Sequence, residues 1–476
     1  MVPWFSPESW RGLYCWQPCC RAWRDLKTGG KEVKPVKDPG NRKISLGTRI
    51  MLVMTFLVLI GSVMVLIRFS SGRTIDLTGA KMNLLNLEDG YSGPDEVTGV
   101  PGSTPGTGNT ASGSLSEQQS ETAVPQAVTP IPASAERSFT MTVAGTVAID
   151  GEVRKNSYFS DSKTYDFSDT MNLLKNELRS DLNVVFLENI ISDDDKVSDT
   201  VTPASVARVL RNAGFQMAAC GFANAWARES TGVSATRMNL RENGITPVGV
   251  YETENLNRVN ITEIRGIPVA ILQYTDTISA STRKKMEKKD ESDTVPAADI
   301  GIIVSDIEEA RKSGAKAVIV LMNWGKVGKT PDKTQKALAQ SIADAGADLI
   351  VGAGSRVPQG AETLTGQLAD GSEKRILCIW SLGTTLSGDR TNIKRMSGYL
   401  LHVRIHLTRD GNVAVEQPEY TPVYTWRYKQ DGQYYYRCLA ANQTPPDGMD
   451  NEQIKNMDKA ADATRAVLEG SPLNER

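Results

Sequence analysis

Short apolar runs recur along the chain after about residue 138, and stretches of helical character separate them. The runs are uninterrupted, as is typical of strands that are covered on both faces of a sheet. They occupy residues 139–149, 184–188, 215–221, 267–275, 315–323, 347–353 and 375–381. Alternation of such strands with helices predicts a layered α/β domain and argues against a β-sandwich or a helical bundle.

Capping residues predict the ends of several helices, and turn residues predict a hairpin. Residues 399–417 alternate like a β-hairpin around Arg409-Asp410-Gly411, and residues 450–468 predict a polar surface helix that Gly470 ends. Three further helices carry start and stop signals: Thr202-Pro203 with Gly214, Thr330-Pro331 with Gly346, and a capping-box pair, Ser305 and Glu308, with Gly314.

An uncharged run of 18 residues, 50–67, is long enough to cross most of a bilayer of roughly 30 Å. Ten Lys and Arg residues precede it, whereas only Arg68, Arg73 and Lys81 follow before a long stretch without cations. The positive-inside rule then places the N-terminus in the cytoplasm. A cleaved signal peptide is the competing interpretation, but the run is longer than an h-region of about 7 to 15 residues. We therefore expect an uncleaved anchor in the plasma membrane.

The segments on either side of this anchor differ in composition. The first 27 residues hold Trp4, Trp10, Trp16 and Trp23 together with three cysteines, a pattern that suits a membrane interface or acylated thiols. From residue 82 to 136 there is no Lys or Arg, and the segment is rich in Gly, Ser, Thr and Pro, which predicts a disordered tether. Such a flexible chain would span on the order of 40 Å.

These signals divide the chain into five parts. They are a cytoplasmic tail (residues 1–49), a transmembrane helix (50–68), a tether (69–137), a folded extracytoplasmic domain (138–430) and a C-terminal extension with a surface helix (431–476).

Composition restricts the chemistry that this domain can perform. The formal net charge is -2 with charges of mixed sign, so no basic stripe for nucleic acid is visible. The two histidines, His402 and His406, lie in one alternating strand about 13 Å apart, too far to share a metal ion, and we expect both on the solvent face. Cys220 and Cys378 lie in apolar runs and are expected to pack rather than pair.

Motifs at the ends of the predicted strands resemble those of the CapA-type family of poly-gamma-glutamate capsule biosynthesis proteins, over residues 139 to about 407. The matching residues are Gly145, Leu187, Glu188, Trp324, Gly325, Gly352, Gln359, Glu362 and Ser381-Leu382-Gly383. The domain of this family is similar to calcineurin-like metallophosphatases. The resemblance therefore implies a layered metallophosphatase-like α/β sandwich.

The positions that would hold metal ions in the family carry other residues here. The aspartate that closes the first strand is Thr146, and the histidine positions are Asn224, Asn323, Ala353, Gly354 and Arg356. A two-metal phosphoesterase needs carboxylates and several neutral imidazoles, and Arg356 would add a permanent cation. We expect a degenerate site with no catalytic residue, no metal and no cofactor.

Three functional hypotheses follow. The first is a non-catalytic, membrane-anchored protein of capsule or cell-envelope polymer synthesis that binds an anionic polymer or the membrane-bound synthesis machinery. Its ligand-binding candidates are Thr146, Glu188, Asn224, Asn323 and Arg356, with Trp324 as a stacking face. The alternative is an active metal-dependent hydrolase with altered ligands that include Glu188. The third is a structural or signalling partner without a small ligand.

Overall fold

A computed structural model describes residues 136–193, 197–254 and 256–476 of the chain. The cytoplasmic tail, the transmembrane helix and residues 69–135 of the tether that the sequence predicts lie outside these residues. The tether ends earlier than predicted, because Arg137 is already the first residue of a strand. Within the three described ranges, no helix combines the length and the apolar character that crossing a bilayer requires.

The larger of two main sheets has the strand order β18-β17-β16-β1-β4-β7-β8, with β15 paired to β1 and β19 paired to β17. Strands β1, β4, β7 and β8 run parallel, and β16, β17 and β18 continue the sheet as antiparallel neighbours. The strands are β1 (Arg137–Val147), β4 (Leu182–Leu187), β7 (Met217–Ala219), β8 (Thr246–Val248), β15 (Thr384–Leu386), β16 (Ser397–Leu407), β17 (Val413–Gln430), β18 (Gln433–Ala440) and β19 (Asn474–Glu475).

The second main sheet has the order β13-β14-β12-β11-β10-β9. Its central strands β10, β11, β12 and β14 are parallel, and the edge strands β9 and β13 are antiparallel to their neighbours. The strands are β9 (Ile261–Ile264), β10 (Ile267–Thr275), β11 (Ala317–Asn323), β12 (Leu349–Ala353), β13 (Ala361–Gln367) and β14 (Glu373–Ile379). Two short ribbons complete the strands: β2 (Tyr158–Phe159) with β3 (Thr164–Tyr165), and β5 (Ile190–Ile191) with β6 (Val201–Thr202).

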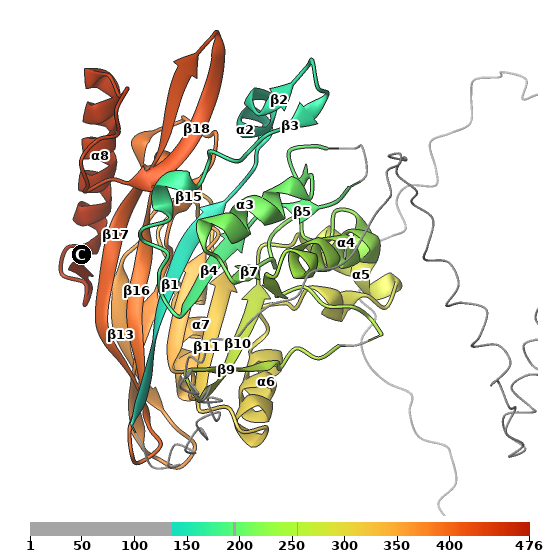
Figure 1. The fold of residues 1–476 in the computed structure, drawn as a ribbon. Helices are drawn as coiled ribbons and strands as arrows, with labels where there is room; N and C mark the ends of the chain where they lie inside the picture. The colour runs from blue at the N-terminus through green and yellow to red at the C-terminus, as the bar shows by residue number, and fades with distance from the viewer. Residues whose placement is uncertain (1–135, 194–196, 255) are drawn as a thin grey trace, which may run out of the picture. The chain divides into compact units, whose positions relative to one another are not determined.

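The two sheets pack face to face, and helices cover their outer faces (Figure 1). Side chains such as Met141 and Val143 of the first sheet and Ile319 and Val351 of the second form the apolar layer between them. The α-helices are α2 (Gly151–Asn156), α3 (Ser205–Ala213), α4 (Glu229–Glu242), α5 (Ala280–Lys288), α6 (Ile300–Lys312), α7 (Lys333–Asp344) and α8 (Asn451–Leu468), and the short 3₁₀ turns are η1 (Asn172–Leu174), η2 (Ser292–Thr294) and η3 (Ile393–Met396).

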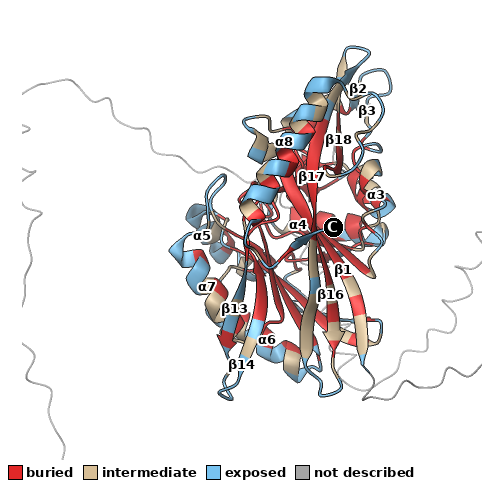
Figure 2. Cartoon of the chain, turned by 90° about the vertical axis from the view of Figure 1, so that its left-hand side faces the viewer, coloured by how far each residue is buried: buried red, intermediate tan, exposed pale blue. Residues whose placement is uncertain are grey.

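Separate apolar clusters lie under these helices. Helices α3 and α4 pack on the outer face of the larger sheet, and α6 and α7 pack on the outer face of the second sheet. The central strands are therefore buried on both faces. Figure 2 shows them mostly in red, the colour of buried residues, whereas the helices carry both buried and exposed residues. This arrangement confirms the predicted layered α/β sandwich.

The predicted helix ends are right and several predicted starts are wrong. Gly214, Gly314 and Gly346 follow the last residues of their helices with positive φ, as expected. The capping box at Ser305 and Glu308 does not exist, because α6 begins earlier and Asp299 caps it. Helices α3 and α7 begin two residues later than the Thr-Pro signals predict, and Thr202 belongs to strand β6.

The predicted hairpin around Arg409-Asp410-Gly411 is present as β16 and β17. Strand β17 continues to Gln430 and pairs with β18, so the extension from residue 431 begins within the larger sheet. The predicted C-terminal helix is α8, which Asp450 caps through a capping box and which buries Met457 and Ala460 against β17 and β18.

His402 does not lie on the solvent face, and this prediction was wrong. The strand position is covered, since only 6% of the residue is exposed. Its Nδ1 lies 3.0 Å from the Thr142 hydroxyl and its Nε2 lies 3.0 Å from the Thr421 hydroxyl. Burial, with a smaller contribution from Arg476, lowers the pKa of His402 to about 3. Cys220 and Cys378 are buried and unpaired, as predicted.

Candidate functional site

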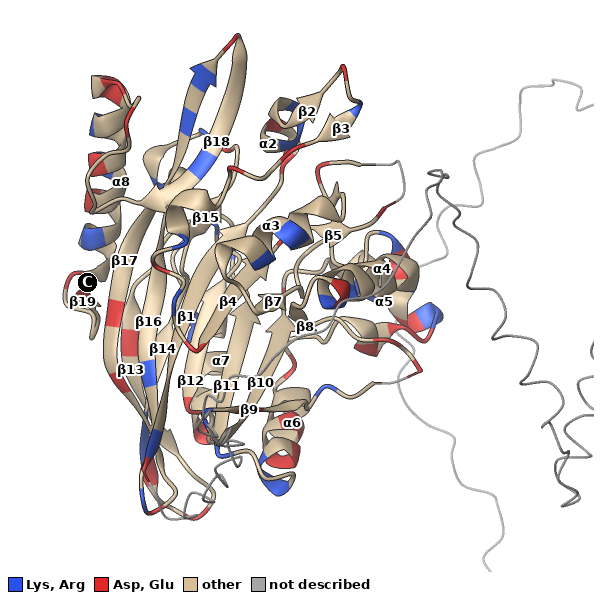
Figure 3. Ribbon diagram, viewed as in Figure 1, with Lys and Arg blue, Asp and Glu red and all other residues tan. Residues whose placement is uncertain are grey.

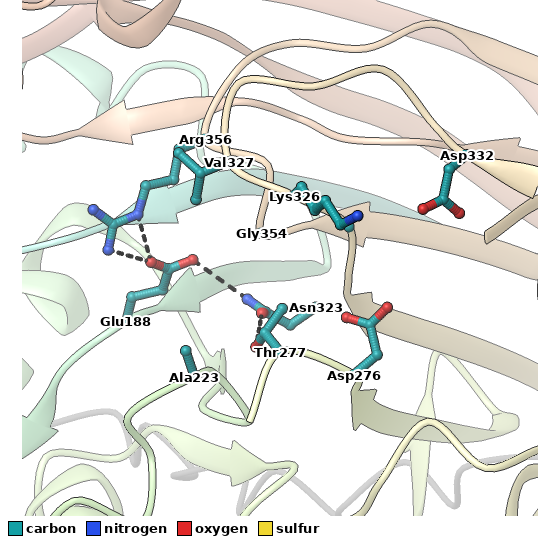
Figure 4. Close-up of a pocket in the computed structure, with 11 residues that line it drawn as sticks. Glu188, Ala223, Asp276, Thr277, Asn323, Lys326, Val327, Asp332, Gly354 and Arg356 are labelled. Carbon is teal, nitrogen blue, oxygen red and sulfur yellow. Dashed lines mark hydrogen bonds and ion pairs between the residues drawn. The ribbon is translucent and has the colours of Figure 1, made fainter. Parts of the chain in front are cut away.

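Strands of both sheets end at a pocket of about 420 Å³ (Figure 4). Thr146 closes β1 and Glu188 follows β4 in the larger sheet, whereas Asn323 closes β11 and Arg356 follows β12 in the second sheet. The carboxyl ends of parallel strands meet at one edge of a sheet, which is where α/β proteins commonly bind ligands. The pocket is lined by Glu188, Ala223, Asp276, Thr277, Asn323, Gly325, Lys326, Val327, Asp332, Gly354 and Arg356.

Two glycines allow the strand ends to approach each other. A Cβ on Gly145 would lie 2.5 Å from the carbonyl oxygen of Gly383, where β1 and β15 come together. A Cβ on Gly352 would lie 2.2 Å from the carbonyl oxygen of Trp380 and 2.4 Å from Nε1 of Trp324. Larger residues would therefore force these chains apart, since real Cβ atoms do not approach so closely.

An ion pair between Glu188 and Arg356 forms one end of the pocket. Nε and Nη2 of Arg356 both donate to Oε2 of Glu188, at 2.8 and 2.6 Å. The other carboxylate oxygen, Oε1, accepts from the Thr146 hydroxyl at 3.3 Å and from Nδ2 of Asn323 at 3.4 Å. The Glu188 side chain is 6% exposed, whereas that of Arg356 is 29% exposed. Every oxygen of this buried carboxylate is thus engaged.

The backbone holds Arg356 in a conformation that few non-glycine residues adopt. Its φ is +56°, in the left-handed region, which costs of order 1–3 kcal/mol. The Thr384 hydroxyl donates to the Arg356 carbonyl at 2.9 Å and fixes this turn. Burial disfavours the charge of Arg356, but nearby Glu188, Asp150 and Asp389 favour it, so its pKa is raised.

The other end of the pocket carries two carboxylates and a lysine that sequence reasoning did not single out. Burial, and then the nearby charge of Asp332, raise the pKa of Asp276, although a backbone N–H of Gly325 opposes the shift. Asp332 also caps helix α7. Lys326 is exposed at the rim, and its ammonium has no hydrogen bond or ion pair with any residue that the structure describes.

One signal in the sequence points to Asp276, the first of these residues. Asp276 and Thr277 directly follow the apolar run 267–275, just as Glu188 follows another run. Polar residues immediately after buried parallel strands are the expected pocket residues of an α/β fold. The rule could have found Asp276, whereas Lys326 and Asp332 lie in the longer loop before α7.

Two candidate residues do not have the position that the sequence suggested. Asn224 is exposed on the loop before α4 and is absent from the pocket lining, although its neighbour Ala223 is present. Trp324 is fully buried, its ring stacks on Trp380 at 5.7 Å and its Nε1 donates to the Trp380 carbonyl at 2.9 Å. Because Trp324 packs under the helices of the second sheet, it offers no stacking face to a ligand.

The side chains at the strand ends do not fit the metal ions that the family resemblance implies. Glu188 spends one oxygen on the Arg356 guanidinium, and Oδ1 of Asn323, the atom that would ligate a metal, accepts from the Thr277 hydroxyl at 3.0 Å. Nowhere in the described part of the chain do three or more His, Cys, Asp or Glu side chains form a group that could hold a metal ion. The permanently charged guanidinium of Arg356 already neutralises the Glu188 carboxylate, which is the charge that a metal ion would supply.

Comparison with known proteins identifies relatives of this chain. It is 31% identical over 123 residues to the PGA biosynthesis protein CapA of Bacillus subtilis (strain 168), covering 26% of this chain and 31% of that protein. It is 25% identical over 238 residues to the capsule biosynthesis protein CapA of Bacillus anthracis, covering 48% of this chain and 56% of that protein. The matches thus span about a third to just over half of these relatives.

Solved structures show a weaker similarity. The crystal structure of the calcineurin-like phosphoesterase YfkN from Bacillus subtilis has a TM-score of 0.32 and 12% identity, covering 71% of this chain and 99% of that one. A novel phosphatase from Mycoplasma pneumoniae has a TM-score of 0.35 and 12% identity, covering 60% and 94%. Scores this low carry nothing over to this chain.

A family match covers most of the described sheets. Residues 140–389 match the family described as "Bacterial capsule synthesis protein PGA_cap", which is more than half of the 476-residue chain. The matched range includes Thr146, Glu188, Asn323 and Arg356 and agrees with the resemblance drawn from the strand-end motifs. The chain therefore belongs to the bacterial capsule synthesis family PGA_cap.

Proposed function

We propose that this protein is a membrane-anchored, extracytoplasmic member of the family that acts in capsule or cell-envelope polymer synthesis or assembly without catalysing hydrolysis. The Glu188–Arg356 ion pair is the observation that carries the proposal. A phosphoesterase of this architecture would need the Glu188 carboxylate free for metal-dependent chemistry. Here the carboxylate is bound by a guanidinium, so the pocket is suited to binding.

The pocket offers hydrogen bonds and positive charge to an anionic ligand. Nε and Nη2 of Arg356 bond Glu188, which leaves the remaining terminal nitrogen, Nη1, without a hydrogen bond to any described residue. Lys326 adds an exposed ammonium at the rim. A guanidinium binds carboxylates and phosphates through charge-assisted hydrogen bonds. An anionic envelope polymer such as a poly-gamma-glutamate-like chain, presented by membrane-bound synthesis machinery, has the required chemistry.

A membrane anchor would keep the pocket close to a growing polymer. The apolar run 50–67 and the cation asymmetry around it support a single-pass anchor with a cytoplasmic N-terminus. The tether of residues 69–137 would let the domain reach on the order of 40 Å from the bilayer. Protease added to the outer face of the intact plasma membrane should digest the folded domain and spare the N-terminal tail, and protection of the domain would contradict this orientation.

A hydrolase with altered ligands is the second candidate, and one observation favours it. Asp276 and Asp332 line the same pocket as Glu188, so additional acidic side chains are at hand. This candidate predicts phosphodiester hydrolysis that depends on added Mn²⁺, Fe²⁺ or Zn²⁺ and is lost in Glu188→Ala. The non-catalytic proposal predicts no hydrolysis above the Glu188→Ala background with any of these ions.

A binding assay tests the proposed function directly. The purified full-length chain should bind polyglutamate in low salt and lose most of that affinity in Arg356→Ala, with little binding to uncharged dextran. A structural or signalling partner without a polymer ligand would be indifferent to this substitution. Equal binding by the wild type and by a folded Arg356→Ala variant would overturn the proposed role of the pocket.

A further inference from the structure

Three basic side chains near the β17–β18 hairpin have no carboxylate partner among the described residues: Arg390, Arg427 and Lys429, here called the cation row. Neighbouring cations differ, since Arg395 pairs with Asp389 and Arg437 pairs with Asp169. Figure 3 shows Lys and Arg along the hairpin, with an acidic residue at its tip. Positive charge without a carboxylate partner is thus concentrated near the β17–β18 hairpin.

Arg390 is the most buried member of the cation row. Its Nη1 donates to the Thr425 carbonyl at 2.8 Å, but its Nε and Nη2 are buried and have no hydrogen-bond partner within the described residues. Its guanidinium lies over the ring of Tyr436, 5.2 Å from the centroid. Burial is the main cause that lowers the pKa of Arg390. Burying a cation with unmet donors is costly, and such groups in native proteins call for a compensating partner.

Arg427 and Lys429 extend the row along the hairpin. They are alternate residues of β17, so both side chains lie on one face of the strand, about 7 Å apart. Both lie over the ring of Tyr434, at 4.6 and 5.6 Å from its centroid. The ring holds the two cations in place while Arg427 and Lys429 stay exposed.

Acidic groups near the row are occupied elsewhere. Asp150 caps α2 and accepts from the Ser387 hydroxyl and the Gly388 N–H. Asp389 receives two bonds from Arg395, and Glu152 pairs with Lys155. Asp431, in the turn between β17 and β18, is the exception, because its carboxylate is exposed and is not paired with a cation of the described residues. The row therefore keeps an excess of positive charge.

The row is also linked to the strand-end pocket. The charge of Asp150 acts on both Arg356 and Arg390, so both guanidinium groups lie within electrostatic reach of one carboxylate. Asp389, which precedes Arg390 in the chain, acts on Arg356 as well. One chain segment joins the two places: the Thr384 hydroxyl donates to the Arg356 carbonyl at 2.9 Å, and Arg390, six residues later, donates to the Thr425 carbonyl of β17 at 2.8 Å.

We propose that Arg390, Arg427 and Lys429 form a second subsite for an anionic polymer, which leaves the Arg356 pocket and continues along the β17–β18 hairpin. The subsite rests on the proposed function and specifies its ligand as a chain long enough to carry several anionic groups. Short anions would occupy the pocket alone, whereas a long polymer would gain affinity from both positions because the second contact is intramolecular.

The test uses the purified full-length chain with polyglutamate of defined lengths in low and high salt. Arg427→Gln/Lys429→Gln removes two exposed cations, and Lys455→Gln/Lys459→Gln removes two exposed cations from α8, which packs on the opposite face of β17. The hairpin variant should bind long polyglutamate about fivefold more weakly, with a shallower salt dependence, and the α8 variant should bind within about twofold of the wild type. Glutamate dimers should bind both variants equally.

If the hairpin variant binds long polyglutamate as the wild type does while Arg356→Ala does not, the subsite is overturned and the pocket stands. If the hairpin variant and Arg356→Ala both bind long polyglutamate as the wild type does, the proposed function is overturned as well. If the hairpin variant loses affinity for vesicles of anionic lipid but keeps it for polyglutamate, the row is a membrane contact and the polymer subsite is overturned. Arg390→Gln, with unfolding monitored, should weaken long-polymer binding if it remains folded, and unchanged affinity would contradict the buried member's role.

Discussion

Arg356→Met should destabilise the folded protein because it leaves Glu188 buried without its counter-charge. Two unit charges about 4 Å apart attract by about 4 kcal/mol at an effective dielectric constant of 20, and removing one partner of a buried pair costs roughly 3 to 5 kcal/mol. Arg356 is 29% exposed and Glu188 keeps bonds from Thr146 and Asn323, so we expect a loss of about 2 to 4 kcal/mol near pH 7.

A second variant separates this cause from a packing defect. Glu188→Gln in the Arg356→Met background should restore most of the stability, because the amide oxygen can still accept from Asn323.

Urea unfolding of the full-length chain near pH 7, followed by tryptophan fluorescence, measures these free energies. The four proteins of the cycle should give a coupling of about 1 to 3 kcal/mol between the two positions. A loss below about 0.5 kcal/mol in Arg356→Met would refute the reasoning. It would mean that another cation already compensates Glu188.

Three further predictions concern residues around the site. Because burial lowers the pKa of His402 to about 3, stability should be lost as the pH falls from 6.5 towards 3, by roughly 3 to 5 kcal/mol at the lower end, and unfolding titrations of His402→Gln should lack this slope. Trp324→Phe should lower the free energy of unfolding by about 1 to 3 kcal/mol through the lost bond to the Trp380 carbonyl, yet leave polyglutamate affinity unchanged, and weaker binding would restore its role as a stacking face. Lys326→Gln should weaken polyglutamate binding about threefold without changing the melting temperature, whereas the exposed Lys333→Gln should change neither, and equal effects would exclude a specific contact at the rim.

The strands were predictable because parallel strands that are covered on both faces must be apolar on both faces. The runs from 139–149 to 375–381 are apolar in this way. The start of α6 was not predictable in the same way. Asp299 caps this helix, but aspartate is as common in turns as it is at the first residue of a helix. His402 was misplaced because its cover comes from Thr142, Thr421 and Arg476, which lie far from it in the sequence.

The candidate site, too, was predictable only in part. Motif spacing placed Glu188 and Arg356 after two predicted strands but did not predict their ion pair. The pair joins residues 168 positions apart and depends on the left-handed turn at Arg356. Asp276 and Lys326 were not predicted because they lie outside the family motifs that mark the metal positions. Trp324 matched the family motif, yet it directly follows β11 and its ring packs into the apolar cluster under the helices of the second sheet.

The metal content of the purified full-length chain tests the central claim most directly. After incubation with Mn²⁺, Fe²⁺ and Zn²⁺ and removal of the excess, elemental analysis should find far less than one equivalent in the wild type, and Arg356→Met should not bind less metal than the wild type. One or two equivalents of tightly bound metal in the wild type, lost in Glu188→Gln, would contradict the account, because the Glu188–Arg356 pair could not then be what occupies the site.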